Sequence, residues 1–412
     1  MAINSDLLKP TGAPERVVSM DILRGVAVLG ILAMNIQSFA MPAAAYGNPT
    51  AFEKLTGNDL WVWLASYVFA DQKFMSIFSM LFGASIMMLS QKARKENLRS
   101  TDLQNRRFIF LAIIGLAHAY LLWFGDILFA YAVCGFLMFS FRNKKTKVQL
   151  RAGILLLAVG SLISLVIGYT TPLWESGELD TARTEIWAPD KSRISEEIEF
   201  STGSWERQIL FRAGEAFQMQ TTVFFFETFW RVSGLMLIGM ALYKRRVFKG
   251  KQGAKYYSKM VGYGFGIGLP LVVVGAILNF NYEWDFQLSF FYFTQLNYWG
   301  SVLMALGYIG VVMLVTKDTS KSFIASKLAA VGRTALSTYL LQSIICGFIF
   351  YGHGLGMFGD LDRSAQAVLV LGIWVFNIIF ANVWLKYFQY GPFEWLWRSL
   401  SYGKAQRFFR ST

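Results

Sequence analysis

Long apolar segments recur along nearly the whole chain, and they restrict its fold more than any other feature. A helix needs about 20 apolar residues to cross a lipid bilayer, and fewer where it tilts or packs against neighbours. Backbone polar groups inside a bilayer must find partners within the protein, which favours helices. The sequence therefore predicts an all-α, polytopic membrane bundle of about ten transmembrane helices, over residues 22–40, 72–90, 108–124, 127–141, 148–168, 221–243, 260–280, 290–315, 335–350 and 366–388.

The composition supports a membrane bundle over several soluble domains. Hydrophobic residues make up 55% of the 412 positions and charged residues only 16%, whereas a soluble domain carries about 25% charged residues. We expect one transmembrane bundle over residues 21–412. Cys134 and Cys346 both lie inside apolar runs, which favours buried free thiols and predicts no disulfide framework.

Basic residues gather on alternate connections between the predicted spans. These connections hold 29 Lys and Arg against seven on the intervening ones, and they are the segments before residue 21 and at 91–107, 142–151, 244–259, 316–333 and 386–412. The positive-inside rule then places both chain ends in the cytoplasm, with residues 1–20 as a cytoplasmic segment and 389–412 as a basic tail. Topology and anionic lipids thus explain the net charge of +13, which argues against nucleic acid as a partner.

The longest connection, residues 169–220, has the opposite charge. It carries ten acidic residues against five basic ones and few aromatic residues. It has too little apolar surface for a large core of its own. We expect an extracytoplasmic acidic cap made of short amphipathic helices.

Polar residues in the first span are costly to bury and therefore informative. Asp21 and Arg24 are three residues apart and share a helix face at the cytoplasmic boundary. They either fix the helix end as a snorkelling pair, or Arg24 binds a phosphate or carboxylate that arrives from the cytoplasm. Asn35, nearer the other end of this helix, lines a polar cavity or bonds a neighbouring backbone.

His118 is one of only two histidines and lies beyond the middle of the third predicted span. Imidazole transfers protons near neutral pH, although a neutral histidine bonded across helices would serve structure alone. Asp126 follows eight residues later, about 12 Å along a continuous helix. This separation predicts no direct bond between them unless the turn folds back. We expect Asp126 to cap the fourth span and to face an outer vestibule.

Three further charged or titratable positions are candidates for substrate binding. Glu227 and Arg231 are one helical turn apart in the sixth span, spaced for an ion pair. This pair either faces inward for structure alone or binds substrate. His353 lies in a glycine-rich stretch beyond the ninth span, where a flexible loop residue is the alternative. Lys73, at the start of the second span, is expected to extend its amine to the membrane surface.

Several catalytic signatures are missing from the sequence. There is no G-x-x-x-x-G-K-[ST] phosphate loop, no paired CxxC, no His-rich metal spacing and no G-x-S-x-G nucleophile turn. These absences argue against an ATP-driven pump and a zinc protease, and we expect no metal.

Five stretches resemble a known family. They are SMDILRGVAVLGILAMNI, KFMSIFSMLFGASIMML, GLAHAYLLWFGDILFAYAVCG, VGRTALSTYLLQSIIC and YGPFEWLWRSLSYGK. In this order they resemble the hallmark stretches of the YeiB-like bacterial inner-membrane proteins, a family defined by a domain of unknown function. The opening D-x-x-R-G helix also resembles a wider group of transmembrane acyltransferases, which includes the lysosomal heparan-glucosaminide acetyltransferase.

The wider resemblance implies acyl transfer from cytoplasmic acyl-CoA, such as acetyl-CoA, to a sugar, glycan or lipid head group across the membrane. The YeiB-like resemblance implies a bacterial inner-membrane location and contact with membrane lipids, and the wider resemblance implies a homodimer. The donor site would include Asp21, Arg24 and Arg333. The group's catalytic histidine is expected in the loop after the first span, where MPAAAYGNPTAFEKLTGND has none. Histidine chemistry would therefore fall to His118 or His353.

Three functions remain open from the sequence. In an acyltransferase, His118 would act as a general base or accept the acyl group, and Asp126 would orient the acceptor. A transporter or lipid flippase could use His118 as a proton relay together with Glu227 and Arg231. A non-catalytic membrane protein that binds lipid is the third reading.

Overall fold

The computed structural model describes residues 17–96, 100–319 and 322–410, and no strand occurs within these ranges. The all-α prediction is confirmed. The helices of the first half are α1 (Val18–Ala40), α2 (Ala44–Gly47), α3 (Gly57–Phe69), α4 (Lys73–Lys95), α5 (Thr101–Leu121), α6 (Leu128–Met138), α7 (Thr146–Thr170), α8 (Ser176–Ala182), α9 (Lys191–Thr202) and α10 (Trp205–Gln218). Those of the second half are α11 (Phe229–Lys244), α12 (Ala254–Asn281), α13 (Thr294–Thr319), α14 (Phe323–Arg333), α15 (Ala335–Phe350), α16 (Arg363–Tyr387) and α17 (Pro392–Tyr402).

Seven helices of the described chain are long and apolar enough to cross a membrane. An eighth span is added if α14 and α15, which meet at a bend of 79°, count as one broken crossing. The chain is thus a multi-pass helical membrane protein. The count of about ten is not confirmed: α6 is a short apolar helix, and α5 opens with the polar residues TDLQNRR.

The central helices are buried and the outer ones are largely exposed. In α1, 72% of the most apolar 18-residue window is buried, whereas the corresponding values are 22% for α7 and 28% for α12 and α16. The core includes α4 and α11, which approach closely at Gly83 and Gly239. A Cβ on either glycine would collide with a carbonyl of the facing helix. This glycine contact brings the backbones of the two helices together.

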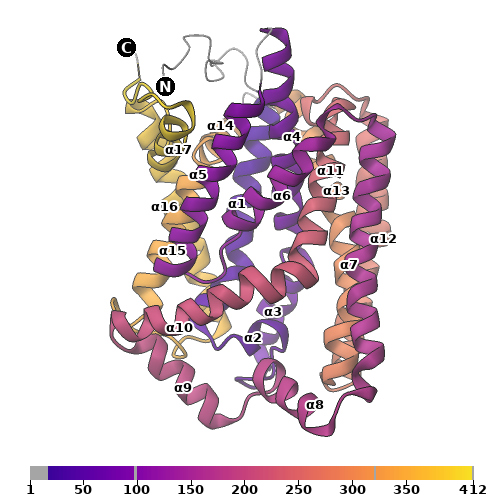
Figure 1. Ribbon diagram of the computed structural model, residues 1–412, viewed down its shortest axis with the longest axis vertical. Coiled ribbons are helices and arrows are strands. Elements are labelled where there is room, and N and C mark those ends of the chain that lie inside the picture. The colour runs from indigo at the N-terminus through magenta and orange to yellow at the C-terminus, as the bar shows by residue number, and fades with distance from the viewer. Residues whose placement is uncertain (1–16, 97–99, 320–321, 411–412) are drawn as a thin grey trace.

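The two ends of the bundle differ (Figure 1). Helices α14 and α17 lie at one end, and α8, α9 and α10 lie at the other. The acidic connection therefore does form short helices, and α9 begins where Asp190 caps the Arg193 amide. Residues 1–16 of the predicted N-terminal segment and 411–412 of the predicted tail lie outside the described residues.

Candidate functional site

A cavity of about 210 Å³ lies between α1, α4, α5, α6, α14, α15 and α17. Most of its wall is apolar. Its lining on α1 runs from Met20 to Ile31, a rise of about 16 Å at 1.5 Å per residue. The polar or charged side chains in the wall are those of Asp21, Arg24, Ser85, Gln104, Arg107, Arg333, Glu394 and Arg398, besides four tyrosines.

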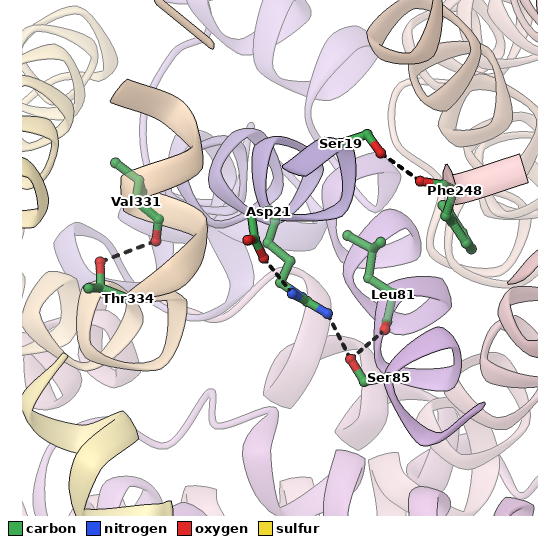
Figure 2. A network of polar contacts seen from close by, with 8 residues as sticks. Ser19, Asp21, Leu81, Ser85, Phe248, Val331 and Thr334 are labelled. Atoms are coloured by element: carbon green, nitrogen blue, oxygen red, sulfur yellow. Dashed lines mark hydrogen bonds and ion pairs between the residues drawn. The ribbon is translucent and has the colours of Figure 1, made fainter. Parts of the chain in front are cut away.

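The predicted donor residues do meet in this cavity. Asp21, Arg24 and Arg333 all line it. Arg24 Nη1 donates to Asp21 Oδ1 at 2.9 Å, and its Nη2 donates to Ser85 Oγ at 2.8 Å. Figure 2 shows this chain of contacts between α1 and α4, with Ser85 bonded in turn to the Leu81 carbonyl. The pair is thus held within the protein and turned toward the cavity.

Two cavity arginines were counted from the sequence only as topology signals. Arg107 stacks over the ring of Trp397 at 4.5 Å, and the Trp397 indole donates to the Arg107 carbonyl at 2.9 Å. Arg398 lies 4.7 Å from the ring of Tyr390. The aromatic-rich tail YGPFEWLWRSLSYGK was the available signal, because tryptophan and tyrosine rings near arginines favour such stacking. Four arginines therefore line one cavity.

Helix α17 also fixes the start of α15. Pro392 opens α17, and Gly403 ends it with a φ of +65° that glycine adopts without strain. Glu394 accepts hydrogen bonds from the backbone amides of Leu336 at 2.6 Å and Ser337 at 3.1 Å, and from the Ser337 hydroxyl. A carboxylate at a helix N-terminus satisfies free amides and complements the helix dipole. Glu394 therefore sets the position of α15.

His118 and Asp126 are directly bonded. His118 Nδ1 lies 2.9 Å from Asp126 Oδ1, and each side chain is only 1% exposed. Helix α5 stops at Leu121 and the next six residues fold back, so the distance along a continuous helix does not apply. Asp126 Oδ2 accepts the Phe129 amide at 2.7 Å, so the expected capping of the next helix is present. The expectation that Asp126 faces an outer vestibule is wrong, because its carboxylate is buried against His118.

Gly115 makes room for this pair. A Cβ at this position would overlap the Phe129 amide and come within 2.9 Å of Asp126 Oδ2. The turn from α5 into α6 can therefore pack against α5 only because residue 115 has no side chain.

Ser343 completes the arrangement, and the sequence analysis missed it. Ser343 lies on α15, and its Oγ is 2.8 Å from His118 Nε2 on α5. Ser343 and His118 are each 2% exposed. The signal in the sequence was weak: a serine in the apolar run STYLLQSIIC, one helical turn beyond Tyr339. Ser343, His118 and Asp126 thus form a hydrogen-bonded row.

Aromatic rings close both sides of this row. Tyr339 lines the cavity, and its ring centroid lies 5.0 Å from that of His118. Trp123 lies 6.3 Å from the imidazole and stacks on Phe39 at 4.2 Å. The row therefore lies next to the inner part of the cavity, with Tyr339 as the neighbour on the cavity side.

The remaining substrate-binding candidates lie away from this row. Asn35 is half-buried on α1 and is not part of the cavity wall. The Glu227–Arg231 ion pair does not form: Arg231 is 1% exposed and donates to the Tyr298 carbonyl and the hydroxyls of Ser76 and Ser301. Glu227 lies in the π-helical segment Met219–Thr228, whose wider turn changes the face on which a residue four positions away lies.

Lys73 does not extend to the membrane surface. Its side chain is fully buried, and Nζ donates to the Tyr67 carbonyl and to Asn297 Oδ1, both at 2.7 Å. Asn297 donates in turn to Asp71 Oδ2 at 2.6 Å. These hydrogen bonds take the place of those that the amine would make with water at the membrane surface. The snorkelling prediction is therefore wrong.

His353 belongs to the opposite end of the molecule. Its Nδ1 lies 2.8 Å from Gln208 Oε1, and its ring meets Trp205 edge-on at 4.9 Å. Burial, with a smaller contribution from Arg212, lowers the pKa of the His353 imidazole. His353 therefore links its loop to α10 and is not brought to His118.

Known proteins are similar to this chain along almost its whole length. The family model described as "Protein of unknown function (DUF418)" matches residues 242–404. The uncharacterized protein YeiB of Escherichia coli is 32% identical over 393 residues, covering 94% of this chain and 96% of its own. The uncharacterized protein YxaH of Bacillus subtilis is 26% identical over 412 residues, covering 98% and 99%. The chain therefore belongs to the family of YeiB-like proteins that carry the DUF418 region.

Proposed function

We propose that this protein is a transmembrane acyltransferase that takes an acyl group from cytoplasmic acyl-CoA and passes it toward an acceptor on the other side. One observation carries the proposal. A single cavity combines four arginines with an apolar interior, and its inner part lies beside the buried His118–Asp126 pair.

The cavity wall suits the chemistry of the donor. Arg24, Arg107, Arg333 and Arg398 lie in the first two turns or the last turn of their helices. Guanidinium groups bind phosphates with charge-assisted, often bidentate hydrogen bonds. The apolar wall along α1 suits the extended, uncharged arm of acyl-CoA. The wall is about 16 Å long, and the arm would lie along it with its end near Tyr339. Bound acyl-CoA would supply an activated thioester there.

His118 would act on protons at the inner end of the cavity. With Nδ1 held by Asp126, its Nε2 atom is the one that can take a proton from a reacting group. Asp126 orients the imidazole and stabilises its charged form. The aromatic rings of Tyr339 and Trp123 limit access of water, which protects a reactive acyl group from hydrolysis.

The proposal places the α14–α17 end in the cytoplasm of a bacterial cell, with the protein in the inner membrane. Support comes from the basic segments 91–107, 244–259 and 386–412, which connect or end helices at this end. The acidic helices α8 to α10 then lie on the acceptor side. A sugar, glycan or lipid head group remains the proposed acceptor class.

The direct test uses purified protein in lipid nanodiscs with radiolabelled acetyl-CoA and a bacterial envelope extract as the acceptor source. We expect saturable binding, release of free CoA and label in a non-CoA product. His118→Ala should abolish release but keep binding. No binding at millimolar concentration together with no CoA release would overturn the proposal.

Arginine variants add a test of the cavity. Arg24→Gln and Arg333→Gln should each weaken binding about 10-fold or more, because a charge-assisted hydrogen bond contributes about 1.5–3 kcal/mol. The matched control is Arg151→Gln, an exposed arginine on α7 outside the cavity wall. Equal affinity of all three variants would place the ligand elsewhere.

A further inference from the structure

Ser343 differs from other serines on the central helices in where its hydroxyl is directed. Ser76, Ser79, Ser85 and Ser90 donate to the carbonyl four residues earlier at 2.6 to 3.0 Å. This is the ordinary local bond of a serine in an apolar helix. In Ser343 the corresponding contact to the Tyr339 carbonyl is 3.4 Å, whereas Oγ is 2.8 Å from His118 Nε2. Its hydroxyl is therefore aimed at the histidine.

The partners of His118 determine which atom donates the hydrogen bond between Ser343 and His118. A carboxylate can only accept hydrogen bonds, so the Nδ1 atom 2.9 Å from Asp126 Oδ1 carries the imidazole proton. A neutral imidazole then has no proton on Nε2, and this atom accepts the hydrogen bond from the Ser343 hydroxyl. This order of nucleophile, base and orienting carboxylate is the geometry that activates a serine, whatever the fold that carries it.

We propose that Ser343 is the nucleophile of this site and carries the acyl group as a covalent ester between two half-reactions. The inference rests on the proposed function for the identity of the acyl donor. It assigns a reaction order in which donor and acceptor never need to occupy the site together.

The first half-reaction moves one proton and exchanges one bond. His118 Nε2 takes the Ser343 hydroxyl proton while Oγ forms a bond to the thioester carbonyl carbon. The carbon–sulfur bond breaks, and the leaving thiolate receives the proton from His118. Ser343 then holds the acyl group as an ester, and free CoA can leave by the cytoplasmic cavity.

The second half-reaction returns the serine. His118 takes a proton from an acceptor hydroxyl or amine, whose oxygen or nitrogen attacks the ester carbonyl. The bond from the carbonyl to Ser343 Oγ breaks, and Oγ receives the proton from His118. Asp126 stays ionised in both steps and stabilises the transient imidazolium.

Tyr339 can assist at the carbonyl oxygen. It lines the cavity, is 4% exposed and precedes Ser343 by one helical turn. Among the described residues, its hydroxyl donates no hydrogen bond. A buried hydroxyl without an acceptor is costly, and a carbonyl that gains negative charge during attack would supply one.

Two reagents test Ser343 separately from the donor. A fluorophosphonate labels activated serines irrespective of CoA binding: Oγ bonds to phosphorus, fluoride leaves and the serine proton passes to His118. Acetyl-CoA with radiolabelled CoA measures exchange of label into acetyl-CoA, which without an acceptor requires an acyl-enzyme. Peptide mass spectrometry locates either adduct.

We expect both adducts on the peptide that contains Ser343. Ser343→Ala should lose them and the exchange, and His118→Ala should slow labelling about 100-fold or more. Ser343→Cys should carry the acyl group as a thioester that hydroxylamine releases. Ser90→Ala, which alters a locally bonded serine outside the cavity wall, should behave as the unmodified protein.

The outcomes separate the two proposals. CoA release with no adduct at Ser343, or full exchange by Ser343→Ala, overturns the serine ester and leaves acyl transfer standing. A fluorophosphonate adduct at Ser343 without any CoA binding overturns acyl-CoA as the donor and supports Ser343 as the nucleophile. Absence of adducts, exchange and CoA binding overturns both.

Discussion

The Nδ1 atom of His118 lies 2.9 Å from Oδ1 of Asp126, although the two residues are eight positions apart at the end of a helix. The bond exists because the chain leaves the α5 axis after Leu121 and folds back before α6 begins at Leu128. A buried imidazole is thereby fixed in one orientation. The proposed chemistry depends on this turn.

Replacing the carboxylate tests the orientation. Asp126→Asn keeps the shape of the side chain, but an amide nitrogen in place of Oδ1 would force His118 into the other tautomer. We expect a loss of about 10²–10⁴-fold in CoA release with nearly unchanged CoA binding. Asp102→Asn, an exposed acid in the first turn of α5, is the control. Equal rates for the two variants would remove Asp126 from the mechanism.

A methyl group at Gly115 should disturb the same turn without removing any of its polar groups. Gly115→Ala places a Cβ against the Phe129 amide and 2.9 Å from Asp126 Oδ2. Overpacking of this kind costs about 1–3 kcal/mol, so we expect a lower Tm and reduced activity. Gly262→Ala and Gly266→Ala on α12, where a Cβ meets nothing within 4 Å, should leave the Tm unchanged or raise it. A neutral Gly115→Ala would mean that the turn is not tightly packed.

Lys73 should be essential for stability because of its buried bonds. Lys73→Met leaves the Tyr67 carbonyl and Asn297 Oδ1 without their donor, and each unsatisfied group costs about 1–3 kcal/mol. We expect a marked fall in Tm by scanning fluorimetry. Lys386→Met removes an exposed lysine of α16 and should have little effect. Similar Tm values for both variants would contradict the buried network.

The stability of α9, at the end of the molecule opposite α17, should depend on pH through Glu197. Burial, aided by the neighbouring Glu215 carboxylate, raises the pKa of Glu197 from about 4.5 to about 7, although the Ala43 amide at 2.9 Å favours the ionised form. The folded state therefore binds its proton more tightly than the unfolded state. This contribution to stability is complete below pH 4.5 and is lost as the pH rises through about 7.

Hydrogen exchange of residues 191–202 measures this dependence. We expect exchange, corrected for the intrinsic pH effect, to increase between pH 5 and 8, and the Glu197→Gln substitution to flatten the profile. Glu196→Gln, at an exposed neighbouring position, should retain it. A profile that does not change in Glu197→Gln would assign the pH response to another group.

Hydropathy predicted the location of the apolar helices, because burial in lipid demands long apolar runs whatever their neighbours. It could not fix the number of crossings. Segment 127–141 reads as a span, yet α6 has only 11 residues from Leu128 to Met138. The bend of 79° lies at Thr334, and the first amides of α15 after it bond Glu394, which is 60 positions later in the chain.

The candidate site was predictable only in part. His118 and Arg24 stood out because charged or titratable groups in apolar segments are rare, whereas Arg333 was named only through the resemblance to acyltransferases. Ser343 did not, since a serine in a helix usually bonds its own backbone. Arg107 and Arg398 looked like ordinary boundary charges until the fold brought them to one cavity. Pairings between distant helices depend on packing, which no local pattern records.

The central claim is that acyl-CoA occupies the arginine-lined cavity with its reactive end at His118. The most direct measurement is a cryo-EM structure of the protein in nanodiscs with a thioether analogue of acetyl-CoA. The account predicts density with its phosphates against Arg24 and Arg333 and its carbonyl beside Tyr339 and Ser343. A cavity filled by lipid acyl chains, with no nucleotide at saturating analogue, would contradict it.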